Sequence, residues 1–467
     1  MIRITPDEIN RQYKIMADVK KHNGTLPVSP KCFVRTFGCQ QNEADSEQLL
    51  GMAREMGYEI CGVPEEADLI LVNTCAVREH AELRALSVTG QFKNLKKARP
   101  SLIIGVCGCM VTQEHRMNAI KNSYPYVDFL IGTGMLYKFP EILRDRLNGG
   151  KRTFTVDEPE GTLAENMPTM RQSKTAAWVS VMYGCDNFCT YCVVPYTRGR
   201  ERSRDFWTVF KQVEALASDG VKEITLLGQN VNSFRSEGKD FATLIEKLCT
   251  IKGDFIIRFM TSHPKDASLR LIDVIADNPK CAKQFHLPLQ SGSDKILKEM
   301  NRRYTTAEYL SLIEYMRKRM PEIAISSDII VGFPGETDED FEATLEMLRK
   351  VEFDMIYSFI YSPRPLTPAA SMIRQVPDEI KSARFNRLLE VQNEISLKKN
   401  LKLVNKTERV LLEGESKSSP DMLTGRADSN KLVHIPRDKR SEALIGSFAN
   451  VRITRAETFA LFGELAK

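Results

Sequence analysis

Three cysteines near the middle of the chain, Cys185, Cys189 and Cys192, have the spacing C-x3-C-x2-C. This spacing puts three thiolates on one short loop, and cysteine thiolates hold iron–sulfur clusters. Three ligands would leave one iron of a cubane cluster free to bind a small molecule. A zinc site is the alternative, but zinc favours paired C-x2-C units with a second pair or a histidine nearby, and no second pair follows here. The spacing therefore favours a cluster with one open iron.

A second set of cysteines, Cys39, Cys75 and Cys109, lies toward the N-terminus, each just beyond a predicted strand. The strands predicted here cover residues 32–37, 68–74, 102–107 and 129–132, and they alternate with helices over residues 43–56 and 78–99. Such alternation predicts a parallel sheet, and ligand sites of open parallel sheets lie at the carboxyl ends of the strands. We therefore expect the three cysteines to meet in space; three unrelated buried cysteines are the alternative.

Cys107 is a rival ligand, two residues before Cys109. Strand alternation does not separate them, because residues two apart point to the same face. We prefer Cys109 because it lies beyond the strand end, in the loop. The remaining cysteines are expected to be structural thiols: Cys32, Cys61, Cys107, Cys249 and Cys281.

The composition is ordinary for a globular protein of two to four domains: 467 residues, 42% hydrophobic and 27% charged, with a net charge of +5. No apolar run is long enough to span a membrane, and Met1–Lys20 lacks the features of a signal peptide. We therefore expect a cytoplasmic protein whose 11 cysteines are metal ligands or buried thiols, not disulfides. The net charge is too small to indicate nucleic-acid binding by itself.

The chain is predicted to be α/β with three domains. The predicted segments are a polar, solvated N-terminal extension (1–30), an N-terminal α/β domain (31–148), a hydrophilic linker (149–172), a central domain (173–403) and a C-terminal domain (404–467). The central domain repeats a strand–helix unit six times, which predicts an open, partial (β/α)6 barrel. Its strands are predicted over residues 177–182, 223–227, 255–260, 284–289, 324–331 and 355–361.

The C-terminal domain has several short, alternating segments, which predict a small β-barrel. Its basic residues include Arg426, Lys431 and Arg452. They fit either a solvated charged face or an RNA-binding face. A second basic run, Arg198 to Arg204, follows the central cysteine loop, and phosphate contacts and salt bridges within the barrel rim both remain open for it.

The central cysteines, with Tyr191 just before the last, resemble the radical S-adenosylmethionine (SAM) signature. The longer run from Gly184 to Arg204 is similar to the methylthiotransferase branch of that superfamily. The resemblance implies that SAM binds the open iron and that one electron cleaves it to methionine and a 5′-deoxyadenosyl radical. It also implies that Tyr191 packs on the SAM adenine and that Asn230, Gln290 and Asp328, at the ends of barrel strands, contact SAM or substrate.

The segments Thr36–Glu47, Asn73–Glu79 and Gly108–Met110 resemble the N-terminal domain of the same family, with Gln41 where the family more often has Met. This resemblance implies that Cys39, Cys75 and Cys109 hold an auxiliary 4Fe–4S cluster that carries the sulfur. A first SAM would methylate that sulfur, and a second SAM would generate the radical. The C-terminal domain resembles the TRAM domain, an RNA-binding barrel.

Within the family, Val77-Arg78-Glu79 is most similar to the branch that methylthiolates C2 of isopentenyladenosine beside the tRNA anticodon. This resemblance implies a tRNA anticodon stem-loop as partner, an electron donor such as flavodoxin or ferredoxin, and a monomer. The residues expected to contact RNA are Arg198, Arg200, Arg426, Lys431 and Arg452. The alternatives are methylthiolation of a ribosomal-protein aspartate or of threonylcarbamoyl-adenosine, and a non-catalytic iron–sulfur protein that binds RNA.

Overall fold

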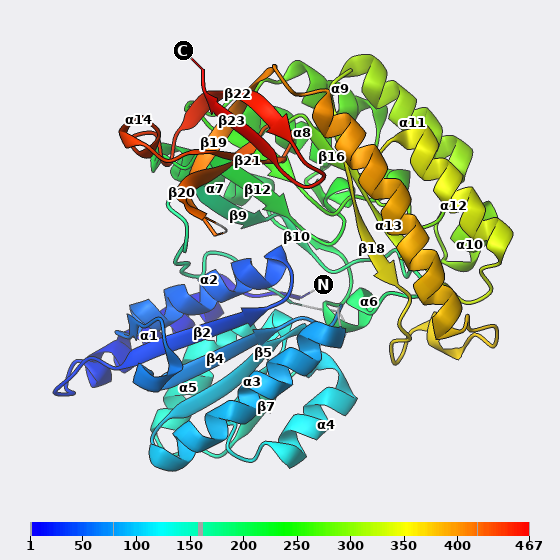
Figure 1. Ribbon diagram of the computed structural model, residues 1–467. Coiled ribbons are helices and arrows are strands. Elements are labelled where there is room, and N and C mark those ends of the chain that lie inside the picture. The colour runs from blue at the N-terminus through cyan, green and yellow to red at the C-terminus, as the bar shows by residue number, and fades with distance from the viewer. Residues whose placement is uncertain (1, 78, 157–161, 418, 467) are drawn as a thin grey trace. The chain divides into compact units, whose positions relative to one another are not determined.

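The computed structural model describes residues 2–77, 79–156, 162–417 and 419–466. Arg78, at the predicted helix start, and residues 157–161 of the predicted linker lie outside the described residues. The chain divides into two compact units (Figure 1). The first contains residues 1–172, 182–188 and 192–204; the second contains residues 173–181, 189–191 and 205–467. No helix in the described ranges is long and apolar enough to cross a membrane.

The first unit is built on a six-stranded parallel sheet of order β3-β2-β4-β5-β6-β7. Its strands are β2 (Lys31–Phe37), β3 (Glu59–Ile60), β4 (Leu69–Thr74), β5 (Ile103–Gly108), β6 (Phe129–Ile131) and β7 (Thr153–Thr155). Strands β4 and β5 are buried along their whole length, as their continuous apolar runs require in a sheet covered on both faces. The short β3 and β7 extend the sheet beyond the predicted strands.

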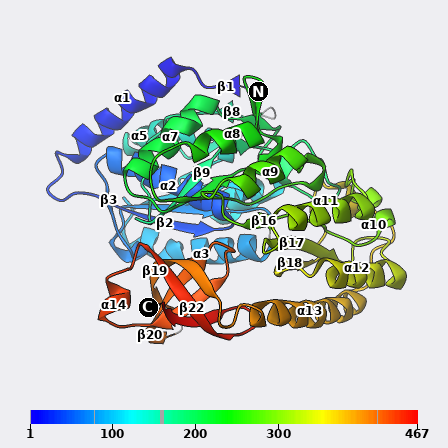
Figure 2. The same cartoon turned by 90° about the horizontal axis from the view of Figure 1, so that it is seen from above.

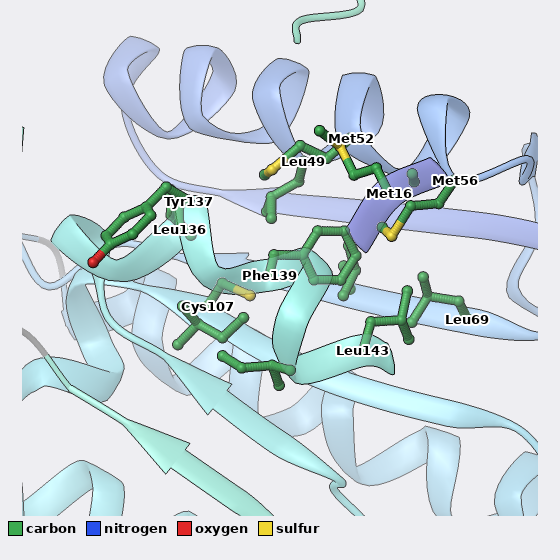
Figure 3. Close-up of a cluster of buried hydrophobic side chains, with 14 of the residues drawn as sticks. Met16, Leu49, Met52, Met56, Leu69, Cys107, Leu136, Tyr137, Phe139 and Leu143 are labelled. Carbon is green, nitrogen blue, oxygen red and sulfur yellow. The ribbon is translucent and has the colours of Figure 1, made fainter. Parts of the chain in front are cut away.

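Helices cover both faces of this sheet. They are α1 (Pro6–Asn23), α2 (Gln40–Glu55), α3 (Glu79–Ala98), α4 (Glu114–Ser123) and α5 (Phe139–Leu147). Side chains of α1, α2 and α5 pack in one apolar group, including Met16, Leu49 and Phe139 (Figure 3), and α3 and α4 pack on the other face. The expectation of a solvated N-terminal extension is wrong for α1, because Ile9, Met16 and Val19 are buried in this group.

The second unit contains the predicted partial barrel. Its strands are β9 (Ala176–Ser180), β12 (Glu223–Leu227), β15 (Ile256–Phe259), β16 (Gln284–His286), β17 (Ala324–Val331) and β18 (Met355–Ile360). They form two parallel sheets, β9-β12-β15 and β16-β17-β18; in the part of the chain that the structure describes, one isolated bridge, between Ile257 and Cys281, joins them. The six-stranded partial barrel is therefore confirmed, with a seam between β15 and β16 that strand patterns did not reveal.

Six helices of this unit begin at polar N-caps whose side chains accept a backbone N–H: Asp205, Asp240, Ser268, Ser293, Thr305 and Thr337. These helices are α7 (Phe206–Ser218), α8 (Phe241–Cys249), α9 (Leu269–Asp277), α10 (Asp294–Glu299), α11 (Thr306–Arg319) and α12 (Asp338–Val351). A further helix, α13 (Asp378–Leu401), follows Pro377 and has no side-chain cap. Helix α13 packs on α12 and β18 and reaches the C-terminal barrel (Figure 2).

The C-terminal residues form a closed barrel of order β19-β20-β21-β23-β22. Its strands are β19 (Thr407–Ser416), β20 (Ser419–Ala427), β21 (Leu432–Pro436), β22 (Phe448–Ala456) and β23 (Leu461–Leu465). Arg258 of β15 attaches it to the partial barrel: its guanidinium pairs with Glu223 at 2.7 Å and donates to the carbonyls of Ala427 and Asp428, both at 2.7 Å. The predicted small β-barrel is confirmed.

Candidate functional site

The structure brings Cys39, Cys75 and Cys109 together at the carboxyl edge of the first unit's sheet. Cys39 is the N-cap of α2, Cys75 follows β4, and Cys109 opens a 3-10 turn (Cys109–Thr112) after β5. The order β2-β4-β5 makes these three strand ends neighbours. The thiols of Cys39 and Cys75 hydrogen-bond to each other, and Cys109 interacts electrostatically with both.

These contacts shift the thiol pKa values in opposite directions. The hydrogen bond from Cys75 lowers the pKa of Cys39 to about 6 and raises that of Cys75 well above its ordinary value. Burial raises the pKa of Cys109 to about 11, against the nearby charge of Arg198, which favours the thiolate. Thiolates are the metal-binding form of cysteine, so a positive charge here suits a cluster.

Arg198 reaches these cysteines from the segment that follows the central cysteine loop. Its side chain is only 5% exposed, and its Nη2 donates to Asp45 of α2 at 2.7 Å. The carbonyl of the preceding residue, Thr197, accepts hydrogen bonds from Thr112 and Thr133. Residues 192–204 therefore belong structurally to the same unit as the N-terminal cysteines.

Close backbone packing holds the cysteine loops, and two glycines permit it. A Cβ on Gly38 would lie 2.7 Å from the Cβ of Cys75, and one on Gly108 would lie 2.4 Å from the carbonyl oxygen of Thr74. The buried amides of Asn42 and Asn73 join the loops, since Asn73 Nδ2 donates to the Asn42 carbonyl at 2.8 Å. The backbone N–H of Cys39 donates to Asn42 Oδ1 at 3.3 Å.

Cys107 takes no part in this arrangement. It lies inside β5 with its side chain in the apolar group beneath α2 and α5 (Figure 3). Cys109 instead contacts Ala76 and Val193, beside the other two cysteines. The geometry therefore favours Cys109 as the third ligand.

The central cysteine loop is closed by a short antiparallel pair, β10 (Met182–Tyr183) with β11 (Arg202–Ser203). Gly184 has a φ of 73°, and a Cβ there would lie 2.1 Å from the carbonyl oxygen of Arg200. Cys185 and Cys192 belong to the first unit, and Cys189 belongs to the second. Cys189 is buried, and Arg302 donates to its sulfur at 3.4 Å.

Among the described residues, no three His, Cys, Asp or Glu side chains converge as the ligands of one metal ion do. Each thiolate of a 4Fe–4S cluster binds a different iron, so such convergence is not needed. Three neighbouring thiols, two of which interact with the charge of Arg198, are a suitable donor set for a cluster with an open iron.

Buried polar side chains at the ends of strands in the second unit could bind a polar small molecule. Asn230, after β12, donates to Asp266 at 2.7 Å but leaves its buried Oδ1 without a partner. Gln290, after β16, has a φ of 72° and a buried, unpartnered Oε1. Both polar atoms of Asn232, which the sequence did not single out, are likewise buried and unpartnered. Unsatisfied buried polar atoms are costly, so a ligand such as SAM would satisfy them.

The other residues predicted for SAM lie nearby in this unit. Asp328 Oδ2 is 3.5 Å from His286 Nε2. Tyr191 packs against an apolar group that includes Ile330 and Phe333. His263, expected as a rim or core residue, is buried; burial and the charge of Arg302 lower its pKa to about 2, so it stays neutral.

The structure corrects two of the predicted RNA contacts. Arg198 faces the cysteines, as described, and Lys431 is 14% exposed and pairs with Asp354 at 2.8 Å. Neither side chain is presented to a phosphate. Arg200 and Arg452 are exposed and Arg426 is half-buried, and each has an acidic neighbour: Arg200 with Asp186, Arg426 with Glu413, and Arg452 with Glu464.

Three known families match parts of the chain. Residues 31–132 match the uncharacterized protein family UPF0004, residues 179–348 the radical SAM superfamily, and residues 401–466 the TRAM domain. The structure is also similar to a radical SAM methyltransferase, TsrM from Kitasatospora setae, with a TM-score of 0.55 over 73% of this chain and 75% of that one. The identity is 14%, so this likeness concerns the fold alone.

Curated relatives match the whole chain. It is 48% identical to the tRNA-2-methylthio-N(6)-dimethylallyladenosine synthase of Thermoanaerobacter pseudethanolicus (strain ATCC 33223 / 39E), over 100% of this chain and 98% of that protein. It is 47% identical to the protein of the same name from Alkaliphilus oremlandii (strain OhILAs), over 99% and 98%. The chain therefore belongs to the tRNA-2-methylthio-N(6)-dimethylallyladenosine synthase family of radical SAM proteins.

Proposed function

We propose that this chain transfers a methylthio group to C2 of N6-isopentenyladenosine beside the anticodon of tRNA. The observation that carries the proposal is the meeting of Cys39, Cys75 and Cys109 in a chain that has a second, radical SAM set of three cysteines. One set of ligands would suffice for radical generation alone. A second set provides for the sulfur that the product gains. The identity with relatives named for this activity supports the substrate.

The chain's residues divide the work between two sites. Cys185, Cys189 and Cys192 would hold one 4Fe–4S cluster, and Cys39, Cys75 and Cys109 the other. When bound, these cofactors supply reductive cleavage of SAM to a 5′-deoxyadenosyl radical and delivery of a methylthio group. The protein supplies orientation: the unpartnered oxygens of Asn230 and Gln290, the amide of Asn232 and the ring of Tyr191 would fix SAM.

The substrate base must leave its stack to reach the radical, which suits a nucleotide in the anticodon loop. The C-terminal TRAM barrel would bind the tRNA, with Arg426 and Arg452 as phosphate contacts and Arg200 as a contact beside the cysteine loop. We further propose that the enzyme works in the cytoplasm as a monomer and takes its electron from a flavodoxin or ferredoxin.

A substrate panel tests this proposal. Anaerobically reconstituted enzyme is given SAM, dithionite and one of four substrates: isopentenylated tRNA, unmodified tRNA, threonylcarbamoylated tRNA or ribosomal protein. We expect methylthio product only from isopentenylated tRNA, and none from a Cys185→Ala control. Product from either of the last two substrates, with none from the first, would assign the chain to another methylthiotransferase branch. Bound clusters without SAM cleavage would indicate a non-catalytic protein.

A further inference from the structure

Arg302 lies in the loop between α10 and α11, and its side chain points inward. It is 8% exposed, and its Nη1 donates to the Cys189 sulfur at 3.4 Å. Its Nη2 donates to the Pro288 carbonyl at 3.1 Å, and its Nε donates to the Tyr304 hydroxyl at 3.1 Å. One guanidinium thus connects a central cysteine to the end of β16.

Arg302 differs from three other buried arginines in its partners. Arg198, Arg258 and Arg384 each have a carboxylate within 2.8 Å. Within the described ranges, Arg302 has no carboxylate partner, and its hydrogen bonds go to a carbonyl, a phenol and a thiol. A buried charge without a counter-charge costs several kcal/mol, so an anion is expected against this guanidinium.

Among the three groups that accept a hydrogen bond from this guanidinium, one is a candidate anion. The Tyr304 hydroxyl donates to the carbonyl of Leu289 at 2.7 Å, and burial raises its pKa, so it stays neutral. His263, whose ring packs edge-on against Tyr304, is neutral as well. The sulfur of Cys189 is the partner that becomes an anion, as a thiolate, when it ligates iron.

We propose that Arg302 is the counter-charge of the cluster held by Cys185, Cys189 and Cys192, and that it sets how readily this cluster accepts an electron. Reduction adds one negative charge to the cluster. A fixed positive charge, buried where screening is weak, stabilises the reduced state more than the oxidised state. Arg302 is therefore a positioning residue that acts through Cys189, and the inference rests on the proposed function of these cysteines.

A matched pair of arginines makes the test specific. Arg303 is adjacent and exposed, so Arg303→Gln makes the same change of charge without touching Cys189. Both changes are made in full-length chains that also carry Cys39→Ala, Cys75→Ala and Cys109→Ala, so that only the central cluster contributes. The readouts are iron content and an EPR-monitored reductive titration.

We expect Arg302→Gln to retain about four irons but to lower the equilibrium constant for one-electron reduction at least tenfold, a shift of about 59 mV. We expect Arg303→Gln to change this equilibrium constant less than threefold. Arg302→Lys keeps the charge, so its equilibrium constant should be close to that of the parent chain.

Each other outcome is decisive. Equal potentials for Arg302→Gln and Arg303→Gln would overturn the inference. If Arg302→Gln loses its iron, retention by Arg302→Lys supports the charge role, whereas loss from both makes Arg302 a structural support only and overturns it. A parent chain with no reducible cluster would contradict the proposed function instead.

Discussion

Replacing Cys109 and Cys107 separately tests how the auxiliary site is built. The two residues differ by only two positions, yet Cys109 lies in the turn beside Cys75, whereas Cys107 is fully buried in the sheet core. Cys109→Ala removes one of three ligands of the auxiliary cluster and leaves the central loop intact. We therefore expect iron to fall from about eight to about four per chain.

The two variants should also differ in activity and stability. Cys109→Ala should lose methylthiolation but still form 5′-deoxyadenosine from SAM. Cys107→Ala should keep both iron and activity, and it should lose about 1–2 kcal/mol of unfolding free energy, because it removes a packed sulfur from a closed core. Iron and sulfide analysis, product assays and thermal unfolding of both variants provide the comparison. Full activity in Cys109→Ala, with loss of iron in Cys107→Ala, would refute the assignment.

Three further predictions concern other positions. Gly108→Ala places a Cβ 2.4 Å from a backbone carbonyl oxygen, so iron analysis should find about half the wild-type iron; wild-type iron would contradict the packing argument. Arg384→Ala leaves the buried carboxylate of Glu336 without its positive partner and should lower the free energy of unfolding, measured by chemical denaturation, by roughly 3–5 kcal/mol. A loss under about 1 kcal/mol would refute this role of Arg384. Burial opposes ionisation of Asp340, but hydrogen bonds from Lys295 and neighbouring groups hold its pKa at about 2, below its ordinary 3.8. Solvent screening of the half-exposed Lys295 reduces its contribution to about 1 kcal/mol, which is present above pH 3.8 and lost as pH falls through about 2. Stability measured against pH for wild type and Asp340→Asn should converge over that range, and a constant difference would count against this.

Local patterns predicted most of the elements that position the two cysteine sets. The buried strands β4 and β5 appear as continuous apolar runs, and α7 and α11 begin and end at the predicted residues. Such patterns carry no information on partners distant in sequence. They could not show the seam between β15 and β16, which depends on sheet register.

Because sequence patterns do not show distant partners, the expected RNA contacts of Arg198 and Lys431 were wrong. Arg198 and Lys431 are ordinary basic residues in the sequence, and only the fold brings Asp45 and Asp354 to them. Arg302 was not predicted at all, because Asn301-Arg302-Arg303 is typical of an exposed basic loop. A buried position between two exposed or half-exposed neighbours becomes visible only when its contacts are known.

Mass spectrometry of tRNA nucleosides from cells with and without this enzyme tests the proposed methylthiolation. We expect 2-methylthio-N6-isopentenyladenosine when the enzyme is present, and N6-isopentenyladenosine in its place when the gene is deleted. Restoration by the wild-type chain, but not by Cys109→Ala or Cys185→Ala, would tie the product to both cysteine sets. An unchanged level of the methylthiolated nucleoside after deletion, in cells with no second enzyme of this family, would show that this chain does not methylthiolate isopentenyladenosine.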